Sequence, residues 1–239
     1  MKYIIMCGGD YEFSKPLTKI NNETLVERTA RLLKENGITD IAISTNNPEY
    51  ENLGIPILHH QNNYKHNDYE QECANSDNIW LNSYYPTKEE CCYLHGDVYF
   101  SESAIKKIIE TPVEDTLFIC TFDETDGERN KYNRKGREPF GYKVKNQEAF
   151  QYAIKKIKQM VDRGKFKGHI TPIAWHVYRF LNGLDVKPEA TEYTQINNIF
   201  QDDGDYIIIN DETVDIDTQN DIDRLEKTLK EIGEEKWKS

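Results

Sequence analysis

A short loop between an apolar strand and a helix is the first stretch whose residues could do chemistry. The apolar residues 3–6 lead into Cys7, Gly8 and Gly9, and one lysine, Lys15, follows before the helix begins. Glycine has no Cβ, so the backbone can turn sharply and its N–H groups can approach an anion, while the lysine adds a mobile positive charge. The spacing therefore indicates a loop that holds phosphate groups. The alternative is an ordinary strand-to-helix turn with a solvated Lys15.

Three aspartates follow predicted strands much further along the chain. Asp97 comes after a middle strand, and Asp215 and Asp217 come after the last one. Mg²⁺ prefers oxygen ligands and keeps several waters beside substrate phosphates, so we expect Asp97 and Asp217, with Asp215 as a further ligand, to hold Mg²⁺. A turn-forming Gly-Asp is the alternative for Asp97. Helix capping is the alternative at the second motif, and it accounts for Thr218 and Asp221 but not for the two aspartates before them.

The elements that position these residues alternate between strands and helices. The patterns predict strands at 3–6, 38–45, 55–60, 91–100 (where the strand ends in Gly96-Asp97), 116–122, 141–145 and 206–209, and helices at 25–34, 101–109, 149–161 and 222–232. This alternation predicts a three-layer α/β/α sandwich around a mostly parallel central sheet, in a single domain that spans residues 1–239. Ligands in such sheets sit at the carboxyl ends of the strands, so the glycine loop and both aspartate motifs should converge there.

Composition excludes several classes of protein. The 239 residues include 30 Lys and Arg against 42 Asp and Glu, a formal charge of −12, which argues against a non-specific nucleic-acid binder. The five cysteines form no CxxC pair and indicate reduced thiols, mostly in core strands. The pair His59 and His60 has no spaced partner and is not a zinc site. The N-terminal apolar run is too short for a signal peptide and no stretch approaches 18 apolar residues, so we expect a soluble, cytoplasmic protein without a membrane partner.

Three segments, in order, resemble the nucleotidyltransferases of the GT-A-like fold, the group that includes sugar-phosphate nucleotidyltransferases, phosphocholine cytidylyltransferases and CMP-sugar synthetases. Residues 14–28 (SKPLTKINNETLVER) are similar to the family's lysine-proline-leucine segment before the first helix. Residues 94–100 (LHGDVYF) resemble the strand that ends in the metal aspartate, and residues 214–222 (VDIDTQNDI) resemble the late aspartate motif. The similarity spans almost the whole chain.

The resemblance implies an enzyme in which a substrate phosphate attacks the α-phosphate of an NTP, preferably CTP, with Mg²⁺ as cofactor and pyrophosphate as leaving group. It implies backbone contacts to the nucleotide from Cys7, Gly8 and Gly9, and stabilisation of phosphate charge by Lys15. Asp97 and Asp217 would hold Mg²⁺. The acceptor would be a sugar phosphate or a small phospho-alcohol, and the product would serve capsule, cell-surface polysaccharide or lipid-head-group assembly.

Further site residues follow from the same resemblance. Asn75, Ser76 and Asn78 fall where the family recognises the base and ribose, although a polar helix-capping role is the alternative. Glu138 and Lys143 lie in the segment that would grip the acceptor, and a hairpin-like turn is the alternative there. His169 could contact the acceptor phosphate, or it could be an ordinary surface or core histidine.

The glycine loop departs from the family pattern. It carries Asp10 and Glu12 and lacks the arginine that touches the triphosphate in the family. The cations that could replace this arginine are Lys19, Lys143, Arg134 and Arg137.

The sequence leaves two other functions open. A glycosyltransferase of the same fold would need an aspartate-x-aspartate motif where this chain has Asp97-Val98-Tyr99. A catalytically weak, nucleotide-binding regulatory module is suggested by the missing arginine. The acceptor, the choice between CTP and UTP or GTP, and the oligomeric state, a homodimer included, also stay open.

Overall fold

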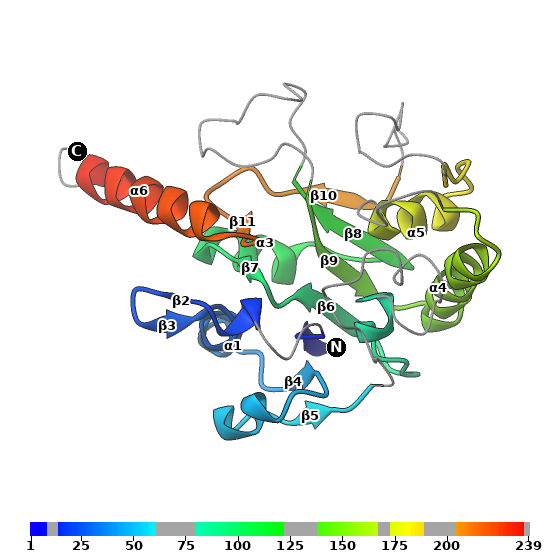
Figure 1. The fold of residues 1–239 in the computed structure, drawn as a ribbon, viewed down its shortest axis with the longest axis horizontal. Helices are drawn as coiled ribbons and strands as arrows, with labels where there is room; N and C mark the ends of the chain where they lie inside the picture. The colour runs from blue at the N-terminus through cyan, green and yellow to red at the C-terminus, as the bar shows by residue number, and fades with distance from the viewer. Residues whose placement is uncertain (9–13, 61–79, 122–137, 167–172, 189–203, 237–239) are drawn as a thin grey trace.

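The computed structural model describes residues 1–8, 14–60, 80–121, 138–166, 173–188 and 204–236. Its centre is a seven-stranded sheet (Figure 1). The strands are β1 (Lys2–Met6), β4 (Ile41–Ser44), β5 (Ile57–Leu58), β6 (Cys91–His95), β8 (Thr116–Cys120), β9 (Pro139–Val144) and β10 (Tyr206–Ile208). Their order is β10-β8-β9-β6-β1-β4-β5, and all neighbours pair in parallel except β9, which is antiparallel to both β6 and β8.

Helices cover both faces of this sheet. Helices α1 (Leu25–Glu35) and α3 (Glu102–Glu110) lie on one side, and α4 (Gln147–Asp162) and α5 (Ile173–Leu181) lie on the other (Figure 1). Strand residues alternate between the two interfaces, as the period of two requires: Ile4 and Met6 pack toward α4 and α5, whereas Tyr3 and Ile5 pack toward α1 and α3. The predicted three-layer sandwich around a mostly parallel sheet is confirmed.

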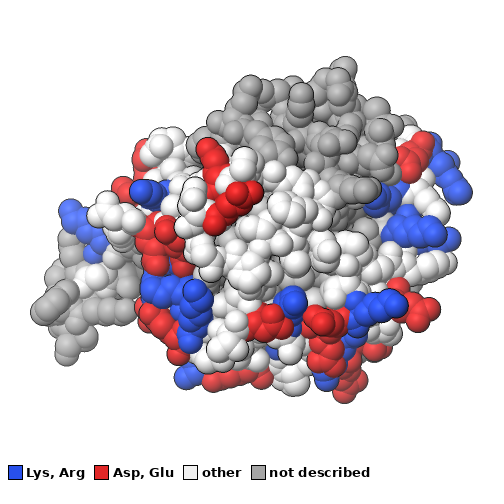
Figure 2. Space-filling model, turned by 90° about the horizontal axis from the view of Figure 1, so that it is seen from below, with Lys and Arg blue, Asp and Glu red and all other residues white. Residues whose placement is uncertain are grey.

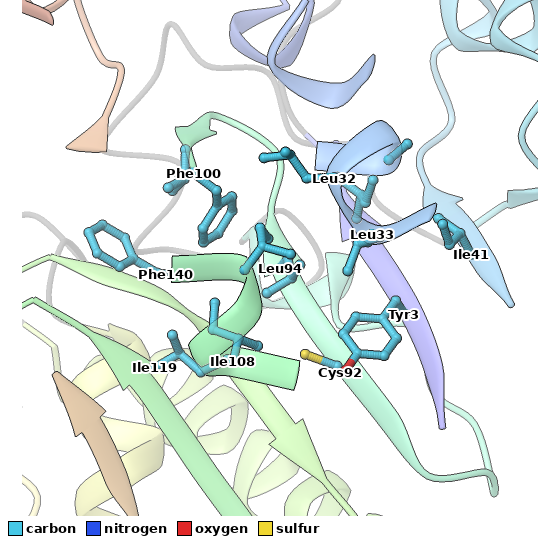
Figure 3. Close-up of a cluster of buried hydrophobic side chains, with 14 of the residues drawn as sticks. Tyr3, Leu32, Leu33, Ile41, Cys92, Leu94, Phe100, Ile108, Ile119 and Phe140 are labelled. Carbon is cyan, nitrogen blue, oxygen red and sulfur yellow. The ribbon is translucent and has the colours of Figure 1, made fainter. Parts of the chain in front are cut away.

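The interface with α1 and α3 is a dense apolar layer. Figure 3 shows Leu32 and Leu33 of α1 and Ile108 of α3 gathered over strand side chains that include Tyr3 and Leu94. These five side chains are at most 3% exposed. Their burial removes apolar surface from water, and this holds both helices against the sheet.

The first helix begins where the sequence predicts it. Thr24 caps α1: its hydroxyl accepts a hydrogen bond from the Glu27 N–H at 3.2 Å, and the Glu27 carboxylate accepts one from the Thr24 N–H at 3.0 Å. This capping box satisfies two backbone donors that a helix start otherwise leaves free. The short hairpin of β2 (Lys19–Ile20) and β3 (Glu23–Thr24) and the 3₁₀ turn η1 (Lys15–Leu17) precede it.

A second, two-stranded ribbon stands apart from the main sheet. Strand β7 (Val98–Tyr99) pairs antiparallel with β11 (Val214–Asp215), and α6 (Gln219–Lys236) follows and extends outward from the body (Figure 1). A small apolar cluster that includes Ile20, Ile216 and Leu225 joins this ribbon and α6 to the β2–β3 hairpin. The prediction that the late aspartates follow the last strand of the sheet is thus corrected, since Asp215 belongs to this ribbon.

Other elements differ from prediction in extent. The strand predicted within 91–100 ends at the turn of Gly96 and Asp97, as expected, and the residues after this turn form a separate short strand, β7. The aromatic stretch 175–180 lies in helix α5, and residues 80–83 form the 3₁₀ turn η4 (Trp80–Ser83). The cysteines at 7, 91, 92 and 120 are free and buried in or beside strands, as expected.

The surface mixes charges of both signs. On the face shown in Figure 2, lysines and arginines alternate with aspartates and glutamates around a largely uncharged centre. Within the part of the chain that the structure describes, no helix is long and apolar enough to cross a membrane.

Candidate active site

Lys15 and Asp217 form an ion pair beside the carboxyl edge of the sheet. The Lys15 Nζ donates a hydrogen bond to Asp217 Oδ1 at 2.6 Å, and the two side chains are 21% and 33% exposed. Lys15 is the first residue of η1, after the glycine loop, and Asp217 follows β11 near the other end of the chain. The predicted convergence of the glycine-loop lysine and the late aspartate motif is therefore present.

The β7–β11 ribbon brings Asp97 and Asp215 to the same place. Asp97 lies in the turn just before β7, and its carbonyl accepts a hydrogen bond from the Ile216 N–H at 3.0 Å. The ribbon register sets Asp215 opposite Val98, the residue next to Asp97. Antiparallel pairing of these two short strands thus joins motifs that are more than a hundred positions apart in the sequence.

The electrostatics of Lys15 show that it shares one site with all three aspartates. Burial by itself would lower the pKa of the Lys15 ammonium, but the negative charges of Asp97, Asp217 and Asp215 raise that pKa above its ordinary value. The side chain is therefore a protonated cation among carboxylates, and it stays charged at neutral pH.

Asp215 carries a buried carboxyl oxygen. Its Oδ1 atom is inaccessible to solvent and has no hydrogen-bond partner among the described residues. Burial, followed by the charges of Asp97, Asp217 and Glu138, raises the pKa of Asp215 well above its ordinary value, while Lys15 opposes the shift. A buried oxygen without a hydrogen-bond partner is costly, so this atom is available to a water, an ion or a ligand group that reaches the site.

The carboxylates fit a hard divalent cation in donor type. The described residues contain no group of three or more His, Cys, Asp or Glu side chains that could hold a metal ion by themselves, and Lys15 stands among the three aspartates instead. Mg²⁺, however, is commonly held by only one or two carboxylates together with water and substrate phosphates. The oxygen ligands of Asp97 and Asp217 and the orphaned oxygen of Asp215 are compatible with that arrangement.

Gly96 allows the aspartate turn to approach the lysine loop. A Cβ on this residue would lie 2.6 Å from the Met6 carbonyl oxygen, 2.7 Å from Cys7 Sγ and 3.1 Å from Pro16 Cγ, the residue after Lys15. Distances this short exclude a side chain, so only glycine permits the turn before β7 to pack on the end of β1 and on η1. Gly96 therefore allows the turn that carries Asp97 to pack against Pro16, the residue that follows Lys15.

Gly8 is crowded by two polar side chains that the sequence did not identify as site residues. A Cβ on Gly8 would lie 1.9 Å from Ser83 Oγ and 3.2 Å from His60 Nε2. The Ser83 hydroxyl and both ring nitrogens of His60 are buried and lack hydrogen-bond partners within the described residues. Burial, with a smaller contribution from His59, lowers the pKa of His60 to about 4, so the ring is neutral at pH 7. The feature of the sequence that could have identified His60 is its position at the end of the predicted strand 55–60.

Cys7 lies at the carboxyl edge of the sheet, and its backbone N–H is already hydrogen-bonded there. The Cys7 N–H donates to the Ser44 carbonyl at 2.9 Å, so this N–H is engaged within the sheet. Burial, then the charge of Asp97, raises the pKa of the Cys7 thiol well above its ordinary value. The thiol is therefore protonated and is no nucleophile.

Of the two predicted acceptor contacts in this segment, Glu138 lies at the site and Lys143 does not. Glu138 is 7% exposed, directly precedes β9 and helps raise the pKa of Asp215, so it lies at the site. Lys143 does not: its Nζ is buried and donates to the Ile108 carbonyl at 2.9 Å and also to the Thr111 carbonyl at the end of α3. Because β9 is antiparallel, its later residues run away from the carboxyl edge, and five residues of strand span roughly 17 Å. The prediction that Lys143 contacts the acceptor, or replaces the loop arginine, is therefore wrong.

Several predicted residues lie outside the described part of the chain. These are Gly9, Asn75, Ser76, Asn78 and His169, together with Arg134 and Arg137. Lys19 is described and lies exposed on β2.

Comparisons with known proteins place the fold. No family model matches the chain, and no curated protein matches its sequence. A Bacillus anthracis structure assigned as a glucose-1-phosphate thymidylyltransferase, in complex with sucrose, is 17% identical with a TM-score of 0.50, over 95% of this chain and 94% of that one. The fold of this protein is therefore that of a nucleotidyltransferase structure, and the resemblance inferred from the sequence is confirmed at the level of the fold.

Two further structures match at lower similarity. The CTP:phosphocholine cytidylyltransferase of Streptococcus pneumoniae is 16% identical with a TM-score of 0.43, over 95% of this chain and 98% of that one. A protein from Mycobacterium tuberculosis H37Rv is 10% identical with a TM-score of 0.49, over 95% and 97% of the two chains.

Proposed function

We propose that this protein is a nucleotidyltransferase that joins an NTP, preferably CTP, to the phosphate of a small acceptor and releases pyrophosphate. The acceptor class is a sugar phosphate or a phospho-alcohol. The observation that carries the proposal is the Lys15 ammonium, which lies 2.6 Å from Asp217 Oδ1 and within the field of Asp97 and Asp215. A fold shared with a thymidylyltransferase structure supports it.

The reaction suits these side chains because it needs charge and position more than a covalent nucleophile. An oxygen of the acceptor phosphate attacks the α-phosphorus, a new P–O bond forms, and the bond from that phosphorus to the β-phosphate bridging oxygen breaks. The acceptor phosphate is already anionic, so no general base is required. Lys15 would move its charge from Asp217 toward the phosphates, where negative charge shifts to the departing pyrophosphate.

Asp97 and Asp217 would hold Mg²⁺, with Asp215 as a further ligand. When bound, Mg²⁺ supplies charge neutralisation on the triphosphate. The same aspartates, in this chain, hold the Lys15 ammonium until the nucleotide arrives.

The nucleotide would cover Gly8 and give hydrogen-bond partners to the groups beside it. His60 and Ser83 are buried, neutral and unpartnered among the described residues, and both lie close to the Gly8 backbone. Neutral donors and acceptors of this kind suit a base or ribose better than a phosphate. The positive charge of Lys15 suits the triphosphate.

The test is pyrophosphate release by the purified protein with Mg²⁺, each of the four NTPs and a panel of phosphorylated acceptors. We expect release with one NTP only when an acceptor is present, and loss of release in Asp217→Asn. Asp223→Asn is the matched control, because Asp223 is an exposed carboxylate on α6 that accepts a hydrogen bond from Gln219 Nε2 at 2.8 Å. Binding of no NTP at all would refute the proposal. Binding of a nucleotide sugar but no NTP would favour the glycosyltransferase, and tight NTP binding without release would favour the regulatory module.

A further inference from the structure

A buried tyrosine lies directly beneath the lysine loop. Tyr50 belongs to the 3₁₀ helix η2 (Pro48–Leu53), is 0% exposed, and packs in the apolar layer between the sheet and helices α1 and α3. Its hydroxyl is hydrogen-bonded to the hydroxyl of Ser14, the residue just before Lys15. Burial of a hydroxyl group destabilises the folded protein unless the hydroxyl makes a hydrogen bond.

The two residues that Tyr50 meets lie on either side of the glycine loop. The Cys7 thiol, at the start of the loop, is close enough to the Tyr50 hydroxyl to affect its pKa, and Ser14 is at the end of the loop. Ser14 occupies the N-cap position of η1 yet makes no side-chain capping bond, because its hydroxyl is directed to Tyr50 instead. One phenol group thus lies close to both ends of the glycine loop, and the second of these ends directly precedes Lys15.

The tyrosine is itself held firmly to the sheet. Asn47 lies just before η2, and its side-chain Oδ1 accepts a hydrogen bond from the Glu49 N–H at 2.9 Å. The Asn47 N–H donates a hydrogen bond to Thr45 Oγ1 at 3.1 Å. Thr45 follows β4, and its N–H donates to the Leu58 carbonyl at 3.1 Å. Tyr50 therefore connects the rigid edge of the sheet to the start of η1.

We propose that Tyr50 is a positioning residue: its hydroxyl, through Ser14, fixes the backbone of η1 so that the Lys15 ammonium reaches Asp217 and the bound phosphates. Tyr50 does not itself touch the reacting groups. This inference depends on the proposed function for its effect on rate, but its effect on the conformation of the loop can be measured without any substrate.

The test compares Tyr50→Phe with Tyr142→Phe, a matched control. Tyr142 is also buried, at 1% exposed, and its hydroxyl donates to the Ala174 carbonyl at 2.7 Å in the layer between the sheet and α5. Each substitution removes one buried hydroxyl and one hydrogen bond, so both should lower the melting temperature similarly, by about 2–4 °C. Only Tyr50→Phe should lower kcat for pyrophosphate release, by about tenfold.

A second readout does not use the reaction. The Leu17 and Thr18 N–H groups donate to the Ser14 and Lys15 carbonyls at 2.9 Å each, so hydrogen exchange of these two amides reports the order of η1. We expect faster exchange there in Tyr50→Phe and unchanged exchange in Tyr142→Phe. In a double-mutant cycle, Ser14→Ala combined with Tyr50→Phe should exchange no faster than either single variant, because both remove the same bond.

The outcomes separate the two proposals. A wild-type protein that binds no NTP would refute the proposed function, while faster exchange in Tyr50→Phe alone would still support the positioning of the loop by Tyr50. Unchanged exchange at Leu17 and Thr18 in Tyr50→Phe would overturn the positioning role, whatever the activity. An equal fall in kcat in both phenylalanine variants would overturn it as well.

Discussion

The Lys15 ammonium lies 2.6 Å from the carboxylate of Asp217, although 202 positions separate the two residues in the sequence. The pair joins the end of the glycine loop to the ribbon that precedes the last helix. Because Asp97 and Asp215 also act on the ammonium, one cation balances several carboxylates before any substrate is present. The arrangement keeps a mobile positive charge at the edge of the sheet where a triphosphate would bind.

Replacement of Lys15 by methionine should lower kcat/KM for pyrophosphate release by about 100- to 1000-fold. Methionine keeps much of the side-chain volume and removes the charge that stabilises the transition state, and loss of one such donor costs about 2.7–4 kcal/mol. Steady-state kinetics with the preferred NTP would measure this. Lys34→Met is the control, since Lys34 is an exposed cation in the last turn of α1, and it should change kcat/KM by less than about twofold. Equal losses in the two variants would contradict the role of Lys15.

The same variant should respond to Mg²⁺ more strongly than the wild type. Lys15→Met leaves Asp97, Asp215 and Asp217 without their cation, and like charges this close repel each other. A divalent cation should relieve that repulsion, so we expect a larger rise in melting temperature on going from EDTA to millimolar Mg²⁺ in Lys15→Met than in the wild type. Lys15→Met combined with Asp217→Asn should lose part of the gain. An identical response of wild type and Lys15→Met would argue that these carboxylates do not bind the metal.

Much of this site follows from the order of motifs in the sequence. Lys15 and Asp97 come after strand ends, and a parallel sheet brings such ends to one edge whatever the details of packing. The position of Asp215 could not be predicted in the same way, since nothing local reveals that a two-residue strand after position 213 pairs with β7 rather than with the sheet. The prediction that Asp215 lies near Asp97 was correct. The prediction that it follows a strand of the main sheet was wrong, because Asp215 belongs to β11 of the ribbon.

Lys143 shows why other residues could not be placed from sequence. The pattern at 141–145 indicates a strand but carries no information on its direction, and an antiparallel β9 reverses which end lies at the site. Glu138 therefore reaches the carboxyl edge and Lys143 does not. Tyr50 and His60 were missed for a related reason, because their contacts to Ser14 and near Gly8 come from elements that are distant in sequence.

His60 and Ser83 should contribute to nucleotide affinity. Their buried polar atoms lack hydrogen-bond partners among the described residues, so a nucleotide that pairs with them gains hydrogen bonds at little cost in desolvation. His60→Phe and Ser83→Ala should each weaken NTP binding in calorimetry by about 1 kcal/mol, or roughly fivefold, with little change in kcat. His176→Phe is the control, because the ring nitrogens of His176 are also buried without a hydrogen-bond partner among the described residues, but His176 lies on α5 beside Phe166. A loss of affinity confined to one NTP would assign the contact to the base, and an equal loss for all four would assign it to the ribose.

Lys143→Met should reduce stability without reducing nucleotide affinity. The buried ammonium donates to the carbonyls of Ile108, Ile109 and Thr111, which end α3, and methionine would leave these acceptors without their donor. Loss of a partner for buried backbone groups costs about 1–3 kcal/mol of unfolding free energy, which urea denaturation would measure. Lys145→Met serves as the control on the same segment. A large rise in KM with unchanged stability would restore Lys143 to the site and contradict its structural role.

Protonation of His176 should make the protein less stable in mild acid. Burial, then the charge of Arg179, lowers the pKa of His176 from 6.5 to about 4 in the folded protein. Below pH 6.5 the unfolded chain therefore binds a proton at this ring that the folded protein does not, so the contribution of His176 to stability falls as the pH drops from 6.5 toward 4. Between pH 7.5 and pH 5 the loss should reach at most about 2 kcal/mol. Urea denaturation of the wild type and of His176→Phe at both pH values isolates this term from the other titrating groups. The wild type should lose more stability than the variant, and equal losses would show that His176 is protonated without cost in the folded state.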